Sequence, residues 1–445
     1  MKTHLLFILA FAALATAGLA ETATPKVRLS ADLAHPRILA GKKMTTYLKV
    51  GLTGFDLEAA AKRAPVNVAI VIDKSGSMQG DKIRHARDAA KQALDRLGAG
   101  DTVSVIAFSD KVEVVVPASS LAEREAVKAA IDRIQAGGST ALFSGVSKGS
   151  EELRKNKQSD RVNRIVLLSD GIANVGPSSP QDLGRLGTAL SKEGITVTTL
   201  GLGLDYNEDL MVELALRSDG NHAFIKNREE LAGIFQREFG DILSVVAQRI
   251  EIRIRCAEGV RPVRVLGREA DIRGQEVTVT MNQLYARQEK YVLLEVEIPE
   301  GAAETDASVA EVQLSCINAI SKSEDKITSR SVARRASDAA LVTASTNKVV
   351  LVDVAKFIGS EKEALAVKLN DEGKHEEAIK AYSAAAAWCT QQGKLLGAQE
   401  LDKMGADQIV RQRLFLDGGD GANSARKMQK EDYNINTLQN SGLKK

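Results

Sequence analysis

Five oxygen-bearing side chains could together bind a hard metal ion; they are Asp73, Ser75, Ser77, Thr140 and Asp170. The first three occupy alternate positions directly after the apolar run Val66–Ile72, the fourth follows Gly137-Gly138-Ser139, and the last ends the apolar segment Ile165–Ser169. Carboxylate and hydroxyl oxygens suit Mg²⁺, Mn²⁺ or Ca²⁺ better than Zn²⁺ or copper. The sequence therefore predicts a divalent-metal site, provided that the fold brings the three segments together.

The segments around these residues have the pattern of a parallel sheet covered by helices. From residue 66 to about 245, apolar runs such as Val66–Asp73 and Arg164–Ser169 alternate with amphipathic segments such as Asp81–Leu97. This alternation predicts a doubly wound, mostly parallel α/β sheet with helices on both faces. Ligands of such sheets bind outside the carboxyl ends of the strands. We expect the acids at positions 73 and 170 to lie at that edge.

The periodicity changes to two after the α/β segment. Alternating apolar residues in Arg249–Cys256 and Tyr291–Ile298 predict an antiparallel sheet with one buried face. Two predicted strands before the α/β segment, in residues 26–55, have no partners of their own. We therefore expect the α/β domain to be inserted into an antiparallel β-sandwich. An α-helical region follows, and within it 369–382 is similar to one tetratricopeptide unit, with a plain helical hairpin as the alternative.

The start of the chain is typical of a secretory signal. Lys2 is followed by the apolar stretch Leu5–Ala17, shorter than a membrane span, and by small residues before Glu21. We expect export to the periplasm, the cell envelope or the medium, with an uncleaved anchor as the alternative. The predicted organisation is a signal peptide at 1–20, sandwich strands at 26–63, the α/β domain at 64–246, the rest of the sandwich at 247–325, a helical region at 331–415 and a disordered tail at 416–445.

The net charge and the cysteine content say something about possible partners and about a possible disulfide. The 445 residues carry a net charge of +2, which gives no electrostatic argument for nucleic acid as a partner. An exported protein could form a disulfide between Cys256 and Cys316, which lie in similar strand-like segments; the alternative is two separate buried thiols. Cys389 lies in a helical pattern, and we expect it to be buried.

The spacing Asp73-x-Ser75-x-Ser77, with Thr140 and Asp170 downstream, resembles the von Willebrand factor A domain and its metal-ion-dependent adhesion site at all five positions. The whole chain is similar to bacterial secreted proteins in which this domain has flanking β and helical segments. The resemblance implies that the two serines and the threonine bind the metal directly. It also implies that the two aspartates act directly or through water.

Together these features predict an exported, divalent-metal-dependent protein-binding module for adhesion or scaffolding. The metal, Mg²⁺ or else Mn²⁺ or Ca²⁺, would recruit a Glu or Asp of a protein partner, and we expect neither catalysis nor a transmembrane span beyond the signal segment. A zinc peptidase is disfavoured because His375-Glu376 is followed by Ile379 where a second His is needed. The alternatives are a Mg²⁺-dependent hydrolase, a structural envelope protein with a vestigial site, and residues that merely cap helices.

Overall fold

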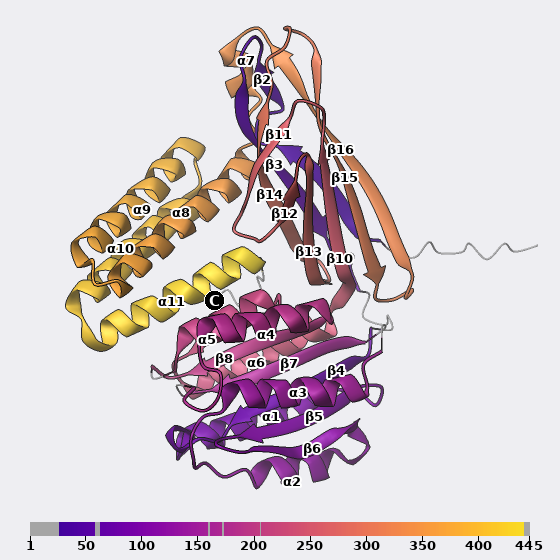
Figure 1. Cartoon of the computed structure of the whole chain (residues 1–445), viewed down its shortest axis with the longest axis vertical. Helices are drawn as coiled ribbons and strands as arrows, with labels where there is room; N and C mark the ends of the chain where they lie inside the picture. Colours follow the sequence, from indigo (N-terminus) through magenta and orange to yellow (C-terminus); the bar gives the residue numbers. More distant parts are fainter. Residues whose placement is uncertain (1–25, 58–62, 159–160, 171–172, 205, 440–445) are drawn as a thin grey trace, which may run out of the picture.

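The computed structural model describes residues 26–57, 63–158, 161–170, 173–204 and 206–439. A β-sandwich and an α/β domain lie end to end, and a helical region packs beside both (Figure 1). The predicted signal peptide at 1–20 lies outside the described residues. Within these described ranges, no helix is both long and apolar enough to cross a membrane.

The α/β domain is built on a six-stranded sheet in the order β6-β5-β4-β7-β8-β9. All neighbours are parallel except β5 and β6. The strands are β4 (Val66–Asp73), β5 (Thr102–Phe108), β6 (Val112–Ser120), β7 (Val162–Ser169), β8 (Ile195–Leu202) and β9 (His222–Ile225). Every residue of β4 and β7 is buried, as burial on both faces of a parallel sheet requires.

Helices cover both faces of this sheet, because alternate residues of each strand face opposite sides. Residues of α1 (Asp81–Arg96), α2 (Arg124–Asp132) and α6 (Arg228–Leu243) pack with one set, and residues of α3 (Leu142–Lys155), α4 (Pro180–Lys192) and α5 (Glu208–Arg217) with the other. Two short 3₁₀ helices, η1 (Gly76–Met78) and η2 (Leu121–Glu123), follow β4 and β6. The predicted doubly wound α/β class is confirmed.

The β-sandwich consists of two sheets with the orders β1-β3-β14-β11 and β12-β13-β10-β15-β16-β2. The first contains β1 (Arg28–Leu33), β3 (Met44–Thr53), β11 (Arg261–Leu266) and β14 (Glu289–Ile298); the second contains β2 (Arg37–Leu39), β10 (Val245–Cys256), β12 (Asp271–Arg273), β13 (Glu276–Tyr285), β15 (Asp306–Asn318) and β16 (Glu324–Ala336). Strand β3 pairs with β14 over its whole length. Strands from before and after the α/β domain thus share one sheet, which confirms the expected insertion.

The sandwich extends further along the chain than the predicted limit at residue 325. Strand β16 continues to Ala336, and its alternating burial matches its antiparallel pairing with β15. Helices therefore begin at Ala339, and 331–336 is strand rather than helix.

The cysteines are all free and buried. Cys256 lies opposite Ala310 in β15, six positions from Cys316, which puts the two thiols roughly 20 Å apart. The disulfide alternative was wrong.

Up to residue 439, where the described part ends, five helices follow the sandwich: α7 (Ala339–Ala344), α8 (Lys348–Asp371), α9 (His375–Leu396), α10 (Gln399–Asp417) and α11 (Gly419–Leu438). Gly373, with a φ of +76°, makes the tight turn between α8 and α9, so the expected helix-turn-helix is present. The likeness of this hairpin to a tetratricopeptide unit stays a prediction.

Over Gly419–Leu438, helix α11 contradicts the expectation of a disordered tail at 416–445. It lies between the α/β domain and the other helices (Figure 1). The buried ammonium of Lys427 donates to the backbone oxygen of Tyr206 at 2.8 Å and to Glu208 at 2.5 Å. Asn434 accepts a hydrogen bond of 3.0 Å from the backbone nitrogen of His222, on the edge strand β9. The polar residues that suggested a solvated tail are instead bonded to the α/β domain.

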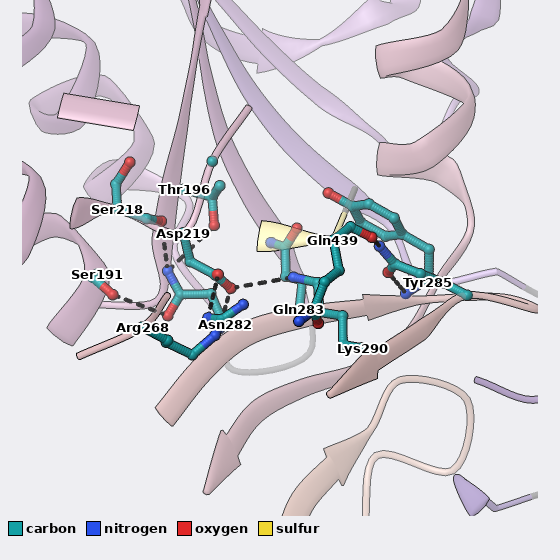
Figure 2. A network of polar contacts seen from close by, with 12 residues as sticks. Ser191, Thr196, Ser218, Asp219, Arg268, Asn282, Gln283, Tyr285, Lys290 and Gln439 are labelled. Atoms are coloured by element: carbon teal, nitrogen blue, oxygen red, sulfur yellow. Dashed lines mark hydrogen bonds and ion pairs between the residues drawn. The ribbon is translucent and has the colours of Figure 1, made fainter. Parts of the chain in front are cut away.

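A buried polar network joins the α/β domain to the sandwich, and Figure 2 shows its centre at Asp219. Asp219 follows α5 with a φ of +57°, and its carboxylate accepts a hydrogen bond of 2.7 Å from the backbone nitrogen of Asn282. Arg268 at 3.3 Å and Lys290 at 3.5 Å, both from the sandwich, neutralise it. Separating the α/β domain from the sandwich would leave these buried charges without their partners, so the network favours one arrangement of the two domains.

Candidate metal-binding site

The two predicted acidic ligands lie side by side at the carboxyl edge of the parallel sheet. Strands β4 and β7 are parallel neighbours, with Ile72 opposite Leu168, so Asp73 and Asp170 emerge within one residue of the same level. Both carboxylates are fully buried. The register of two central strands therefore brings together acids that are nearly a hundred positions apart in the sequence.

Hydrogen bonds connect four of the five predicted residues in one continuous chain. Asp73 Oδ1 accepts a bond of 2.8 Å from the backbone nitrogen of Ser75. The hydroxyls of Ser75 and Ser77 lie 3.0 Å apart, and Ser77 donates to Asp170 Oδ1 at 2.9 Å. Ser77 is exposed whereas Ser75 is buried. The four side chains thus form a row that begins in the protein interior and reaches solvent at Ser77.

Thr140 reaches the same edge through its backbone. The backbone nitrogen of Gly137 donates to the carbonyl oxygen of Lys74 at 2.7 Å. The backbone nitrogen of Gly76 donates to the carbonyl oxygen of Gly138 at 2.9 Å, so hydrogen bonds join the two loops. Gly138 has a φ of +87°, and a Cβ there would lie 2.2 Å from a carboxylate oxygen of Asp110, so glycine is required. This close approach puts the buried Thr140 in the loop beside the four connected residues.

Three further residues support the site, and the sequence reasoning missed all of them. Ser169 donates to Asp73 Oδ2 at 2.5 Å, and the ammonium of Lys82 forms an ion pair with Asp170 Oδ2. Asn174 accepts a bond of 2.8 Å from the backbone nitrogen of Thr140. The one sequence signal was the short separation of two of them from predicted ligands, since Ser169 directly precedes Asp170 and Lys82 follows Ser77 by five positions.

The electrostatics of the acid pair favour a bound cation. Burial raises the pKa of Asp73, hydrogen bonds from Ser169 and Ser75 lower it, and the negative charge of Asp170 raises it again. The two carboxylates therefore repel each other in a buried site. A positive ion placed between them would relieve that repulsion.

The donor set fits a hard divalent ion. It offers two carboxylates and three neutral hydroxyls, all of them oxygen, which is the ligand type of Mg²⁺, Mn²⁺ and Ca²⁺. Throughout the described ranges, no group of three or more His, Cys, Asp or Glu side chains is placed to hold a metal. A zinc or copper centre of the usual nitrogen and sulfur ligands is therefore not offered by the part of the chain that the structure describes.

Comparison with known proteins agrees with the fold of the α/β domain. The family model described as von Willebrand factor type A domain matches residues 67–237. The Synechocystis sp. protein "Uncharacterized protein sll0103" is 31% identical over 249 residues, which is 54% of this chain and 59% of that protein. The chain thus spans less than two thirds of the length of this curated relative.

Two solved structures share the fold at low sequence identity. The von Willebrand factor type A protein from Catenulispora acidiphila superposes with a TM-score of 0.67 at 19% identity, covering 85% of this chain and 89% of that one. The ArnB paralog VWA2 from Sulfolobus acidocaldarius gives a TM-score of 0.62 at 21% identity, covering 93% of this chain and 99% of that one. The whole arrangement, and not the α/β domain alone, therefore occurs in other proteins.

Domains of this family generally mediate protein–protein interaction or adhesion, and they commonly bind a divalent metal. The strand order, the sheet-edge site and the family match lead to one assignment. Residues 67–237 of this chain belong to the von Willebrand factor type A domain family.

Proposed function

We propose that the chain is an exported protein-binding module whose partner is recruited through a divalent metal, Mg²⁺ or else Mn²⁺ or Ca²⁺. Ser75, Ser77 and Thr140 would bind the ion directly, and Asp73 and Asp170 would hold it directly or through water. The observation that carries the proposal is the hydrogen-bonded row from Asp73 to Asp170 at the sheet edge, with both acids fully buried. An adhesion or scaffold role follows from this site.

The kind of partner follows from the ligand set. Neutral hydroxyls donate little charge, so the bound ion would stay electron-poor and would accept a further carboxylate oxygen. Ser77 is exposed, which leaves the solvent side of the row accessible to another molecule. A Glu or Asp on a protein surface fits this requirement, whereas a nucleic acid has no support from the net charge of +2.

Catalysis is not part of the proposal. A Mg²⁺-dependent hydrolase would need a side chain that accepts a proton or attacks the substrate. Asp73 is the obvious candidate, but its two oxygens already accept hydrogen bonds from Ser75 and Ser169. The hydrolase alternative predicts turnover of phosphate or ester substrates with Mg²⁺, and this turnover should disappear in Asp73→Ala. A structural envelope protein with a vestigial site predicts no metal binding at all.

Capture experiments with and without a chelator test the proposal. The immobilised protein should retain an acidic partner from envelope extracts in Mg²⁺ and release it in EDTA. Ser77→Ala should lose this capture because it removes an exposed hydroxyl from the site. Ser119→Ala is a matched control, because Ser119 is an exposed serine opposite Val103, at the other end of the sheet. Equal capture with and without EDTA, or equal capture by the wild type and Ser77→Ala, would contradict metal-dependent binding.

A further inference from the structure

The ammonium of Lys82 contacts the buried acid pair at Asp170. Lys82 is the second residue of α1, and Gly80 is the residue directly before that helix. Its ammonium pairs with Asp170 Oδ2, while Asp170 Oδ1 accepts the hydrogen bond from Ser77. The lysine side chain is 34% exposed and the aspartate is fully buried. The ammonium therefore reaches inward from a partly solvated position to a carboxylate that has no contact with solvent.

The place of Lys82 in its helix does not by itself favour a lysine. A positive side chain in the first turn of a helix opposes the helix dipole, which prefers acids at that end. The lysine also lies against the loop after β8, since a Cβ at Gly203 would be 3.8 Å from its Cε and Nζ. The side chain is therefore bounded by this loop on one side and by Asp170 on the other, and its charge is offset by the buried carboxylate.

The ammonium and a divalent ion need the same negative charge. Asp73 and Asp170 together supply at most two negative charges, which a divalent ion alone would balance. With the ammonium also at Asp170, two cations would share one buried carboxylate. Like charges held a few ångströms apart at low dielectric repel strongly. The metal and the Lys82 ammonium therefore oppose each other at Asp170.

We propose that Lys82 is an internal competitor of the divalent ion. Its ammonium holds Asp170 in the metal-free protein and is displaced, or at least repelled, when the metal binds. This inference rests on the proposed function, because it concerns the regulation of the same site. The lysine would stabilise the metal-free fold and would weaken metal affinity, so that the site fills only when the free ion is abundant or when a partner's carboxylate adds negative charge.

Calorimetric titration of chelator-stripped protein with Mg²⁺ tests this competition. Lys82→Met keeps most of the side-chain length and removes the charge, and it should bind Mg²⁺ about tenfold more tightly than the wild type. Lys82→Arg keeps the charge and should stay within about threefold of the wild type. Lys91→Met is the matched control on the same helix, because Lys91 pairs with Asp88 and Asp132, away from the site. It should leave the dissociation constant unchanged.

Thermal unfolding gives a second readout that a merely structural lysine would not produce. Without metal, Lys82→Met should melt below the wild type, because Asp170 loses its ammonium. At saturating Mg²⁺ that difference should vanish or change sign. A dissociation constant for Lys82→Met equal to or weaker than that of the wild type would overturn the competition while leaving metal binding itself intact. Failure of both proteins to bind any divalent ion would overturn the competition and the proposed function together.

Discussion

His222 should make the α/β domain sensitive to mild acid. Its imidazole is fully buried in β9, where Nδ1 lies 2.9 Å from the hydroxyl of Thr199 and Nε2 lies 3.2 Å from that of Tyr206. Burial and, to a smaller extent, the positive charge of Lys427 together lower the pKa of His222 from its ordinary 6.5 to about 3. The folded protein therefore holds this histidine neutral, whereas the unfolded chain protonates it near pH 6.5.

The sign and size of the effect follow from that difference in pKa. A base whose pKa is lowered by folding contributes its stability above the unfolded pKa, and this stability is lost as the pH falls toward the folded pKa. At about 1.4 kcal/mol for each pH unit, the loss is about 2 kcal/mol at pH 5 and at most about 5 kcal/mol near pH 3. The free energy of unfolding therefore begins to fall below pH 6.5, a pH range that ordinary buffers cover.

Urea unfolding at pH 7.5, 6 and 5 measures this loss in the wild type and in His222→Gln. Far-UV circular dichroism is the suitable probe, because the single tryptophan, Trp388, lies in α9 outside the α/β domain. The glutamine variant should lose about 2 kcal/mol less than the wild type between pH 7.5 and 5. His375→Gln, at an exposed position, should behave as the wild type does. Equal losses in the wild type and His222→Gln would refute the reasoning.

Two further variants test the inter-domain network and the site loop. Asp219→Asn leaves Arg268 and Lys290 facing a neutral side chain in a buried network, so it should lower the free energy of unfolding by about 3 kcal/mol; the exposed Asp271→Asn should change it by less than about 0.5 kcal/mol in the same denaturation assay. Gly138→Ala should weaken Mg²⁺ binding in calorimetry, because its Cβ would collide with Asp110. Gly176→Ala has a similar positive φ and open space around it, so equal losses of binding in both variants would contradict a specific role for the loop.

Much of the fold was visible in the sequence because burial leaves a pattern. Strands β4 and β7 are continuous apolar runs, and that pattern, together with the acid at each carboxyl end, was enough to predict one sheet edge for Asp73 and Asp170. The change to alternating residues in β10 and later strands indicated the sandwich in the same way. The α/β domain, the β-sandwich and the insertion of one into the other could therefore be predicted from periodicity.

What the sequence did not reveal depends on contacts between distant segments. Helix α11 has a polar composition, and its order comes from partners such as Glu208 for the buried Lys427, more than two hundred positions away. The pairing of Lys82 with Asp170 could not be predicted either, because the two residues are 88 positions apart. Whether Cys256 and Cys316 could meet depended on the register of β10 against β15, which no single strand encodes.

The central claim is that the five residues bind one divalent ion, and Thr140 is its most exacting test because that residue joins the other four through its loop. Equilibrium unfolding of chelator-stripped protein should be followed over a Mg²⁺ titration for the wild type and Thr140→Ala. The wild type should gain about 2.7 kcal/mol of stability when the free ion reaches a hundred times its dissociation constant, and Thr140→Ala should gain far less at the same concentration. No gain in the wild type, or an equal gain in Thr140→Ala, would contradict the account.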